Sequence, residues 1–223
     1  MRDTIRGQCV GADFCQELSG QLDTEFHRTY GACASTRIIG RSQSLCLLVD
    51  MSPLCVGHLL IVSEQHYLSF AGVMREHGPE VKDVLDLVFS QYQNTFGEPV
   101  VLEHGSSLDT GDSGCITHAH WHLFPLDLDA IHKIMLTDGL SFTELAGVED
   151  LAAVDQGIPY FFAADRSRQR LYDVERMRRQ YLRSVAGELL GIPDPEWDYA
   201  VVVRKEFFWR TMYQVINWHL TIE

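Results

Sequence analysis

Three histidines alternate with other residues between Thr117 and Pro125, and imidazole is the side chain whose proton chemistry suits neutral pH. In a β-strand, successive side chains point to opposite faces, so His118, His120 and His122 would line one face at intervals of about 7 Å. Each buried imidazole needs partners for two ring nitrogens. The row therefore predicts either metal ligands or a nucleophilic histidine with helpers. The alternatives are a polar face of an exposed strand and a chance cluster.

The composition narrows the class of protein. A chain of 223 residues, 46% of them apolar, can form one large domain or a domain with a substantial extension. It has no run of 18 apolar residues and no apolar N-terminal segment, so we expect a cytoplasmic protein that does not bind membranes. Its six cysteines suit reduced thiols or metal ligands better than a disulfide framework. A net charge of −13 argues against nucleic acid as a partner but allows a small phosphate ligand.

The elements that position the histidines are predicted from periodicity and turn residues. A strand from Cys115 or Ile116 to Pro125 carries the histidines, and a loop rich in Ser, Gly and Asp precedes it over 106–114. The clearest helix spans 79–96, where apolar residues recur at helical spacing and Gly97 follows. Four short strands, each an apolar or β-branched run, are predicted upstream over 36–40, 45–49, 57–63 and 99–104.

The rest of the chain is less regular. A short helix is expected around 13–22. After Pro125 we predict helices over 142–154, 175–190 and 205–218, a hairpin of 159–163 with 170–174, and a strand over 197–203. Four basic residues stand out in the second of these helices: Arg176, Arg178, Arg179 and Arg183. They form either a solvated helix face or a positive patch turned towards the histidines.

Two separated segments resemble motifs of the histidine-triad (HIT) hydrolases and transferases. His118-Ala119-His120-Trp121-His122-Leu123-Phe124-Pro125 is similar to the family's His-x-His-x-His motif. The segment from Val49 to Val62 contains Asp50, Pro53 and the pair Gly57-His58, and it resembles the family's upstream strand-turn-strand motif. The motifs agree in order and context, and the resemblance extends over roughly residues 8–126.

This resemblance implies an α+β fold, in which a mainly antiparallel sheet of about five strands carries one long helix. It divides the chain into a HIT-like catalytic core over 1–126 and an α/β C-terminal extension over 127–223, packed on the core. Many members of the family are homodimers, and the extension would either permit or block that pairing.

The resemblance also assigns catalytic roles. His120 aligns with the nucleophile that attacks an α-phosphorus and forms a nucleotidyl-histidine. His122 aligns with the histidine that hydrogen-bonds the phosphate or the bridging atom. His118 aligns with the first histidine, which fixes the geometry or binds metal, and His58 with a histidine near the site. No cofactor is expected for the chemistry, because a neutral imidazole can split one displacement into two easier steps.

The remaining roles concern the nucleotide and a metal. Asp50 aligns with the acid that holds ribose hydroxyls, and Ser113, Gly114 and Cys115 align with a Gly-Gln-Ser run at the phosphate. Here Gly114 replaces the Gln and Cys115 replaces the Ser. Some members bind structural zinc, and the residues that match those ligands are Cys9, Cys15, His66 and His118. The cysteines are separated by five residues instead of two, so a zinc site and ordinary thiols both stay open.

The function implied is a nucleotide hydrolase or nucleotidyltransferase whose partner is a nucleotide or a nucleotide conjugate. A neighbouring histidine would donate a proton to the leaving group, and backbone N–H groups of the loop would hold the phosphate. The alternatives are transfer to a specific metabolite and a catalytically weak nucleotide-binding protein.

Overall fold

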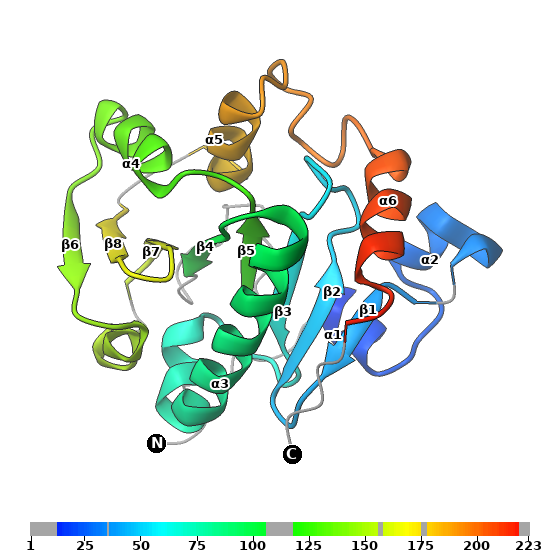
Figure 1. The fold of residues 1–223 in the computed structure, drawn as a ribbon, viewed down its shortest axis with the longest axis horizontal. Helices are drawn as coiled ribbons and strands as arrows, with labels where there is room; N and C mark the ends of the chain where they lie inside the picture. The colour runs from blue at the N-terminus through cyan, green and yellow to red at the C-terminus, as the bar shows by residue number, and fades with distance from the viewer. Residues whose placement is uncertain (1–12, 35, 106–117, 156–157, 175–177, 219–223) are drawn as a thin grey trace.

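A single antiparallel sheet of eight strands runs through the protein (Figure 1). The computed structural model describes residues 13–34, 36–105, 118–155, 158–174 and 178–218. The strand order is β1-β2-β3-β5-β4-β7-β8-β6. The strands are β1 (Ile38–Arg41), β2 (Leu45–Val49), β3 (Leu59–Ser63), β4 (Val100–Gly105), β5 (His120–Phe124), β6 (Phe142–Leu145), β7 (Tyr160–Ala164) and β8 (Gln169–Asp173).

The sheet is larger than the predicted five strands because the segment after residue 126 adds three more. The hairpin predicted over 159–163 and 170–174 is confirmed within one residue as β7 and β8, and β7 pairs with β4. Residues 142–145, which we predicted to be helical, form the strand β6 beside β8. The sheet therefore crosses the predicted boundary at residue 126 without interruption.

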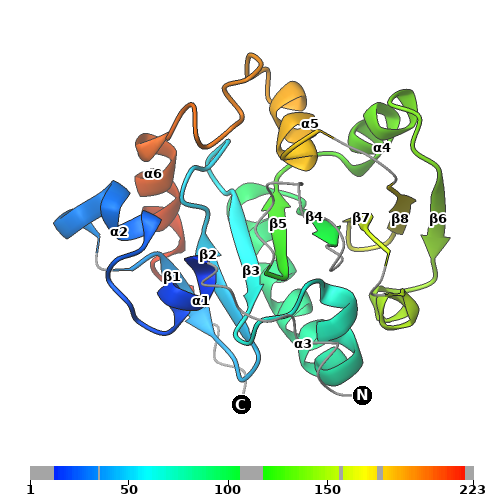
Figure 2. The ribbon, with the colours of Figure 1, turned by 180° about the vertical axis from the view of Figure 1, so that it is seen from behind.

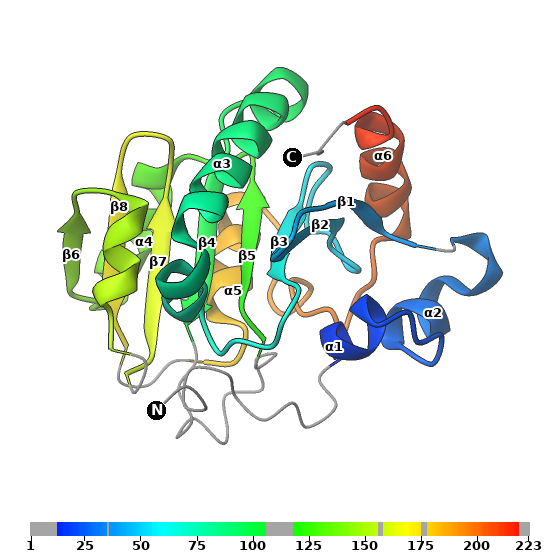
Figure 3. The ribbon, with the colours of Figure 1, turned by 90° about the horizontal axis from the view of Figure 1, so that it is seen from below.

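The two faces of the sheet have different partners because side chains alternate along each strand. Ile61, Trp121 and Leu123 share one buried cluster with α3 (Phe70–Phe96) and α6 (Lys205–Val215). The other face carries His120 and His122 and is covered by α1 (Asp13–Leu18), α4 (Leu128–Thr137) and α5 (Tyr181–Leu189). Figure 3 shows α3 and α6 on one side of the sheet and α1 and α5 on the other.

The long helix α3 begins nine residues before the predicted start at Pro79. Phe70 stacks on Trp121 with ring centroids 3.8 Å apart, so the first turns are fixed by packing on the sheet. Pro79 cannot donate a backbone hydrogen bond, and its ring crowds the preceding turn. The helix accordingly kinks at His77, whose dihedral angles are not helical. Sequence alone places the start at Pro79, but packing continues the helix through the kink.

The C-terminal segment departs furthest from prediction. The helix predicted over 175–190 is observed as α5 and begins at Tyr181, and residues 175–177 lie outside the described part. Residues 197–203 form turns instead of the predicted strand. The terminal helix is confirmed as α6. Elements that were not predicted are α2 (Glu25–Tyr30), α4 and the 3-10 helix Gly31–Cys33, whereas the 3-10 helix Val148–Ala153 lies within the helix predicted over 142–154.

Three contacts join this segment to the turn between β2 and β3. The Ser52 hydroxyl donates to the Val202 carbonyl at 2.9 Å, and the Gly57 N–H donates to the Thr211 hydroxyl at 3.0 Å. Arg183 on α5 makes the third contact. Seen from behind (Figure 2), α6 and α2 lie at the β1 end of the sheet, and α4 and β6 lie at the other. None of the described helices is long and apolar enough to cross a membrane.

Candidate active site

A cleft of about 380 Å³ opens on the sheet face that carries His120 and His122. We call it the triad cleft. The sheet and its turns contribute both histidines and Asp50, and the segment around α1 and α2 contributes mainly Phe14, Arg28 and Arg37. The C-terminal segment contributes Gln180, Leu182, Arg183 and Tyr199. The cleft is therefore formed jointly by the two parts of the chain that the sequence distinguishes.

The backbone of the strand fixes the tautomer of His120. Its Nδ1 lies 2.7 Å from the carbonyl oxygen of His118. A carbonyl can only accept, so Nδ1 carries the proton and Nε2 keeps its lone pair. Burial lowers the pKa of His120, so the ring is neutral at pH 7. A neutral imidazole with a free ring nitrogen at the cleft has the properties of a nucleophile.

A second backbone group fixes the tautomers of His58 and His122. The Leu54 N–H donates to Nδ1 of His58 at 3.2 Å, so His58 carries its own proton on Nε2. That Nε2 lies 2.9 Å from Nδ1 of His122, which must therefore accept. Burial lowers the pKa of His58 to about 3 and holds the pKa of His122 well below its usual value. Neutral His122 consequently presents an Nε2–H donor at the cleft.

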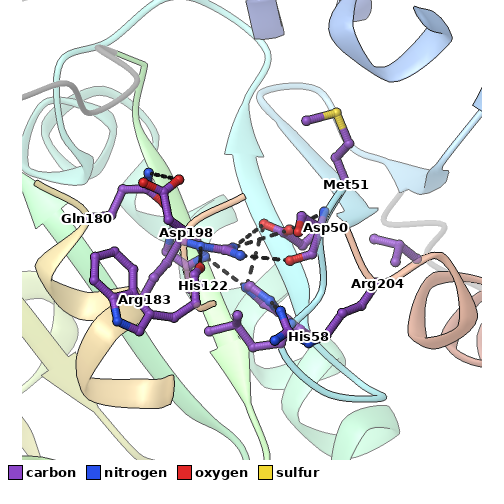
Figure 4. Close-up of polar contacts among 12 residues, drawn as sticks. Asp50, Met51, His58, His122, Gln180, Arg183, Asp198 and Arg204 are labelled. Atoms are coloured by element: carbon purple, nitrogen blue, oxygen red, sulfur yellow. Dashed lines mark hydrogen bonds and ion pairs between the residues drawn. The ribbon is translucent and has the colours of Figure 1, made fainter. Parts of the chain in front are cut away.

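Asp50 and Arg183 stand behind this pair (Figure 4). Asp50 is 7% exposed, and its Oδ2 lies 3.6 Å from Nε2 of His58. Arg183 is 6% exposed, and its Nη1 lies 3.3 Å from Oδ1 of Asp50. Burial opposes ionisation of Asp50, but the neighbouring His58 and Arg183 outweigh it and lower the pKa of this carboxyl. Asp50 is therefore a carboxylate at neutral pH.

Cys15, His66 and His118 form a separate cluster. The Cys15 sulfur lies 3.3 Å from Nδ1 of His66 and 3.3 Å from Nδ1 of His118. Nε2 of His118 donates to the Ser63 carbonyl at 2.7 Å, which leaves the lone pair on Nδ1, beside the sulfur. Tetrahedral zinc, with bonds of about 2.3 Å to sulfur and about 2.0 Å to nitrogen, separates such ligand atoms by about 3.5 Å. These three side chains therefore fit a zinc ion.

The structure thus divides the predicted site residues. His120, His122 and Asp50 line the triad cleft, and His58 lies buried behind them. His118 precedes β5 and joins Cys15 and His66 instead. Four predicted site residues lie outside the described part of the chain: Cys9, Ser113, Gly114 and Cys115.

Among the cleft residues that the sequence did not single out are His104 and Arg183. His104 on β4 lies two residues beyond Leu102, which pairs with His122, so strand alternation would have placed it on the cleft face. Burial, with the charge of His120, lowers the pKa of His104 to about 4. Arg183 was predicted only as one of four basic residues. Its apolar neighbours Leu182 and Val185 were the signal that it lies on a buried helix face.

Comparison with known proteins adds distant similarities. No family model matches the chain, and no curated protein does. Among solved structures, a hypothetical histidine triad nucleotide-binding protein from Sulfolobus tokodaii is 16% identical with a TM-score of 0.35. That match covers 50% of this chain and 66% of that one, slightly under two thirds. A Hit-like protein involved in cell-cycle regulation from Bartonella henselae is 13% identical, with 47% and 76% coverage and a TM-score of 0.32.

A structure of yeast Ap4A phosphorylase in complex with AMP is also similar, at 13% identity and a TM-score of 0.39, over 81% of this chain and 76% of that one. The structures from Sulfolobus tokodaii and Bartonella henselae carry histidine-triad and Hit-like names, which agree with the family that the sequence motifs resemble. All of these TM-scores are below 0.5, so the similarities by themselves do not decide the activity. The function is better argued from this chain's own residues.

Proposed function

We propose that the chain is a nucleotide-processing enzyme of the histidine-triad type, which cleaves at an α-phosphorus through a covalent nucleotidyl-His120. The observation that supports this most strongly is the pair of fixed tautomers at the triad cleft. One ring offers a lone pair on Nε2 of His120, and its neighbour offers an Nε2–H on His122. The two ring centroids are 4.9 Å apart, so both can face one phosphate group. Attack and stabilisation of charge both require such groups.

In the first step, Nε2 of His120 forms a bond to phosphorus while the bond from phosphorus to the leaving group breaks. The ring becomes cationic, and its Nδ1–H continues to donate to the His118 carbonyl, which stabilises that charge. The Nε2–H of His122 holds a phosphate oxygen as negative charge develops. In the second step, water or another acceptor attacks phosphorus and releases its proton to solvent, and the bond to His120 breaks, which restores the neutral imidazole. The nucleoside monophosphate is then released or transferred.

The geometry favours His122 as a hydrogen-bond donor over a proton donor. A second proton on His122 would have to enter Nδ1, which accepts from His58. His58 cannot move its proton from Nε2 to Nδ1 to make room for that proton, because its Nδ1 accepts from the Leu54 N–H. Protonation would therefore break one of two buried hydrogen bonds. The leaving group best suited to this site is one that departs without full protonation, such as a phosphate.

We also propose a structural zinc ion at Cys15, His66 and His118, with Cys9 as the candidate fourth ligand. When bound, zinc would tie α1 to the segment after β3 and to the start of β5. The hydrogen bond from His118 to Ser63 is the outer-shell contact that metal-binding histidines usually make. The chemistry at phosphorus needs nothing from this ion.

The test is turnover by wild type and His120→Gly against nucleoside phosphoramidates, dinucleoside polyphosphates and nucleotide sugars. We expect wild type to release a nucleoside monophosphate, and His120→Gly to be slower by at least about 10³-fold. The matched control is His132→Gln, which removes an imidazole that contacts Tyr172 away from the cleft. Binding without release by wild type would favour the nucleotide-binding alternative, and full activity of His120→Gly would refute the covalent mechanism.

A further inference from the structure

The carboxylate of Asp50 is already engaged within the protein. Oδ1 accepts the Ser52 N–H at 2.7 Å, and Nη1 of Arg183 lies 3.3 Å from Oδ1 and 3.4 Å from Oδ2. Oδ2 also lies 3.6 Å from Nε2 of His58. Both carboxylate oxygens therefore have a buried partner. These contacts fix the carboxylate beside His58 and Arg183, and Oδ2, whose two neighbours lie 3.4 and 3.6 Å away, keeps acceptor capacity.

The guanidinium of Arg183 also makes polar contacts within the protein. Nη1 faces Asp50, Nη2 donates to the Ser52 carbonyl at 2.7 Å, and Nε donates to the Trp197 carbonyl at 3.1 Å. The guanidinium thus connects α5 and the following loop to the turn after β2 (Figure 4). A planar fork held at three points is a rigid group, and its charge stays beside Asp50. The guanidinium also lines the triad cleft.

The contacts of Asp50 lead to His122. His58 donates from Nε2 to His122, and Asp50 lies beside that same nitrogen. We propose that Asp50 and Arg183 are a positioning pair: Arg183 compensates the carboxylate charge beside His58, so that His58 holds His122 as an Nε2–H donor at the cleft. This inference rests on the proposed function. It makes the C-terminal segment part of the catalytic arrangement, because that segment supplies Arg183.

The charges around His122 explain why the carboxylate of Asp50 needs the guanidinium of Arg183 beside it. The titratable and charged groups that face His122 or its neighbours are Asp50, His58, His104, His120, Arg37 and Arg183, and Asp13, Glu25, Arg28 and Tyr199 also line the cleft. Asp50 favours a charged imidazole, and Arg183 opposes it. Without Arg183, an unpaired carboxylate would lie next to His58 and draw a proton to the histidine pair. As shown above, such a proton breaks one of the hydrogen bonds that orient His122.

The first measurement is the ring-nitrogen NMR spectrum of His122 in wild type, Arg183→Gln and Arg204→Gln between pH 6 and 8. We expect wild type and Arg204→Gln to show one tautomer, protonated on Nε2 only. In Arg183→Gln we expect a second or doubly protonated form towards pH 6. Arg204 is the matched control, since its guanidinium contacts Glu196 within the same segment. An unchanged His122 in Arg183→Gln would overturn the proposal.

Kinetics and nucleotide binding provide the second measurement. We expect Arg183→Gln to lower kcat ten- to a hundredfold with little change in KM, because it disturbs orientation and not binding. The Kd of AMP in Arg183→Gln should stay within about twofold of the wild-type value. A loss of AMP affinity as large as the loss in kcat would show that Arg183 acts by binding the ligand and would overturn the positioning role.

The double variant Asp50→Asn/Arg183→Gln guards against misfolding, because it removes both charges and leaves neither unpaired. If Arg183→Gln does not fold, the double variant should fold and should keep His122 neutral at pH 6. A charged His122 in the folded double variant would contradict the proposal. The NMR measurements need no substrate. An absence of turnover in wild type would therefore count against the proposed function, and an unaltered His122 against this inference.

Discussion

Two clusters of three metal-capable side chains flank the strand β5, and their chemistry differs. Cys15, His66 and His118 approach one another at one end, and Asp50, His58 and His122 at the other. In the first cluster, the Ser63 carbonyl takes the Nε2 proton of His118, so Nδ1 faces the sulfur with its lone pair. The first cluster is therefore arranged to bind a cation.

In the second cluster a backbone donor has the opposite effect. The Leu54 N–H occupies Nδ1 of His58, so Nε2, the nitrogen nearest to His122 and Asp50, carries a proton. A metal ion at that position would need the lone pair that the proton uses. The comparison teaches that proximity of ligands does not define a metal site. One backbone group per histidine decides whether a cluster binds metal or forms a chain of hydrogen bonds.

Variants of the two clusters should differ most strongly in their turnover rates. His122→Ala removes the donor at the phosphate, and we expect a loss of about 10²–10³-fold in kcat. Cys15→Ser should change kcat per folded molecule by less than about fivefold, since Cys15 lies outside the triad cleft. Both are measured as steady-state rates on the substrate that wild type cleaves, normalised to the folded fraction. Equal losses in the two variants would show that the clusters work as one site.

Much of the local structure was predictable from the sequence. The adjacent strands β2 and β3 follow from continuous apolar runs on either side of a turn with Pro53. The packing of Trp121 opposite His120 and His122 follows from the alternation of side chains in β5. The histidines at the cleft were predicted for the same reason. Local rules succeed here because β2 and β3 are apolar on both faces, and β5 is apolar on the face that carries Trp121.

The contacts between distant segments were not predictable. Nothing in the residues around Arg183 indicates that its guanidinium reaches Asp50, 133 positions earlier in the chain. The tautomers also escaped prediction, because they depend on the carbonyl of Ser63 and the N–H of Leu54, groups that every residue type would supply. The size of the sheet was missed because β6 has only four residues, most of them exposed, and owes its form to pairing with β8.

The second-largest difference between variants of the two clusters should be in zinc binding. We expect wild type to bind one zinc ion per chain, His66→Ala to bind none after dialysis, and Asp50→Asn to bind as wild type does. At a free zinc concentration a hundred times the Kd, bound metal adds about 2.7 kcal/mol to the free energy of unfolding. His66→Ala should lose that increment, measured by urea unfolding with and without zinc. Zinc retained by His66→Ala but lost by Asp50→Asn would reverse the assignment.

The smallest effect concerns a third polar cluster on the opposite side of β5, where a carboxyl is buried without a cation. Glu103 is 1% exposed and accepts from the Phe70 N–H, the Trp121 indole and the Tyr160 hydroxyl at 2.6, 3.1 and 3.0 Å. Burial outweighs these donors and raises the pKa of Glu103 from 4.5 to about 7. The pKa of Asp50, which has Arg183 beside it, is shifted in the opposite direction.

The sign of the pH dependence follows from that shift. Between pH 4.5 and 7 the folded protein holds a proton on Glu103 that the unfolded chain has released, so the contribution of Glu103 to stability falls as pH rises. From pH 5.5 to 8 this contribution decreases by about 2 kcal/mol. Buried histidines such as His58 and His104 act in the opposite direction, because their lowered pKa values destabilise the fold only when the pH falls through 6.5. Urea unfolding at these two pH values should therefore give Glu103→Gln a change in stability that is about 2 kcal/mol more favourable than the change in wild type and in the exposed control Glu98→Gln. An equal change in all three proteins would show that Glu103 is ionised in the fold despite its burial.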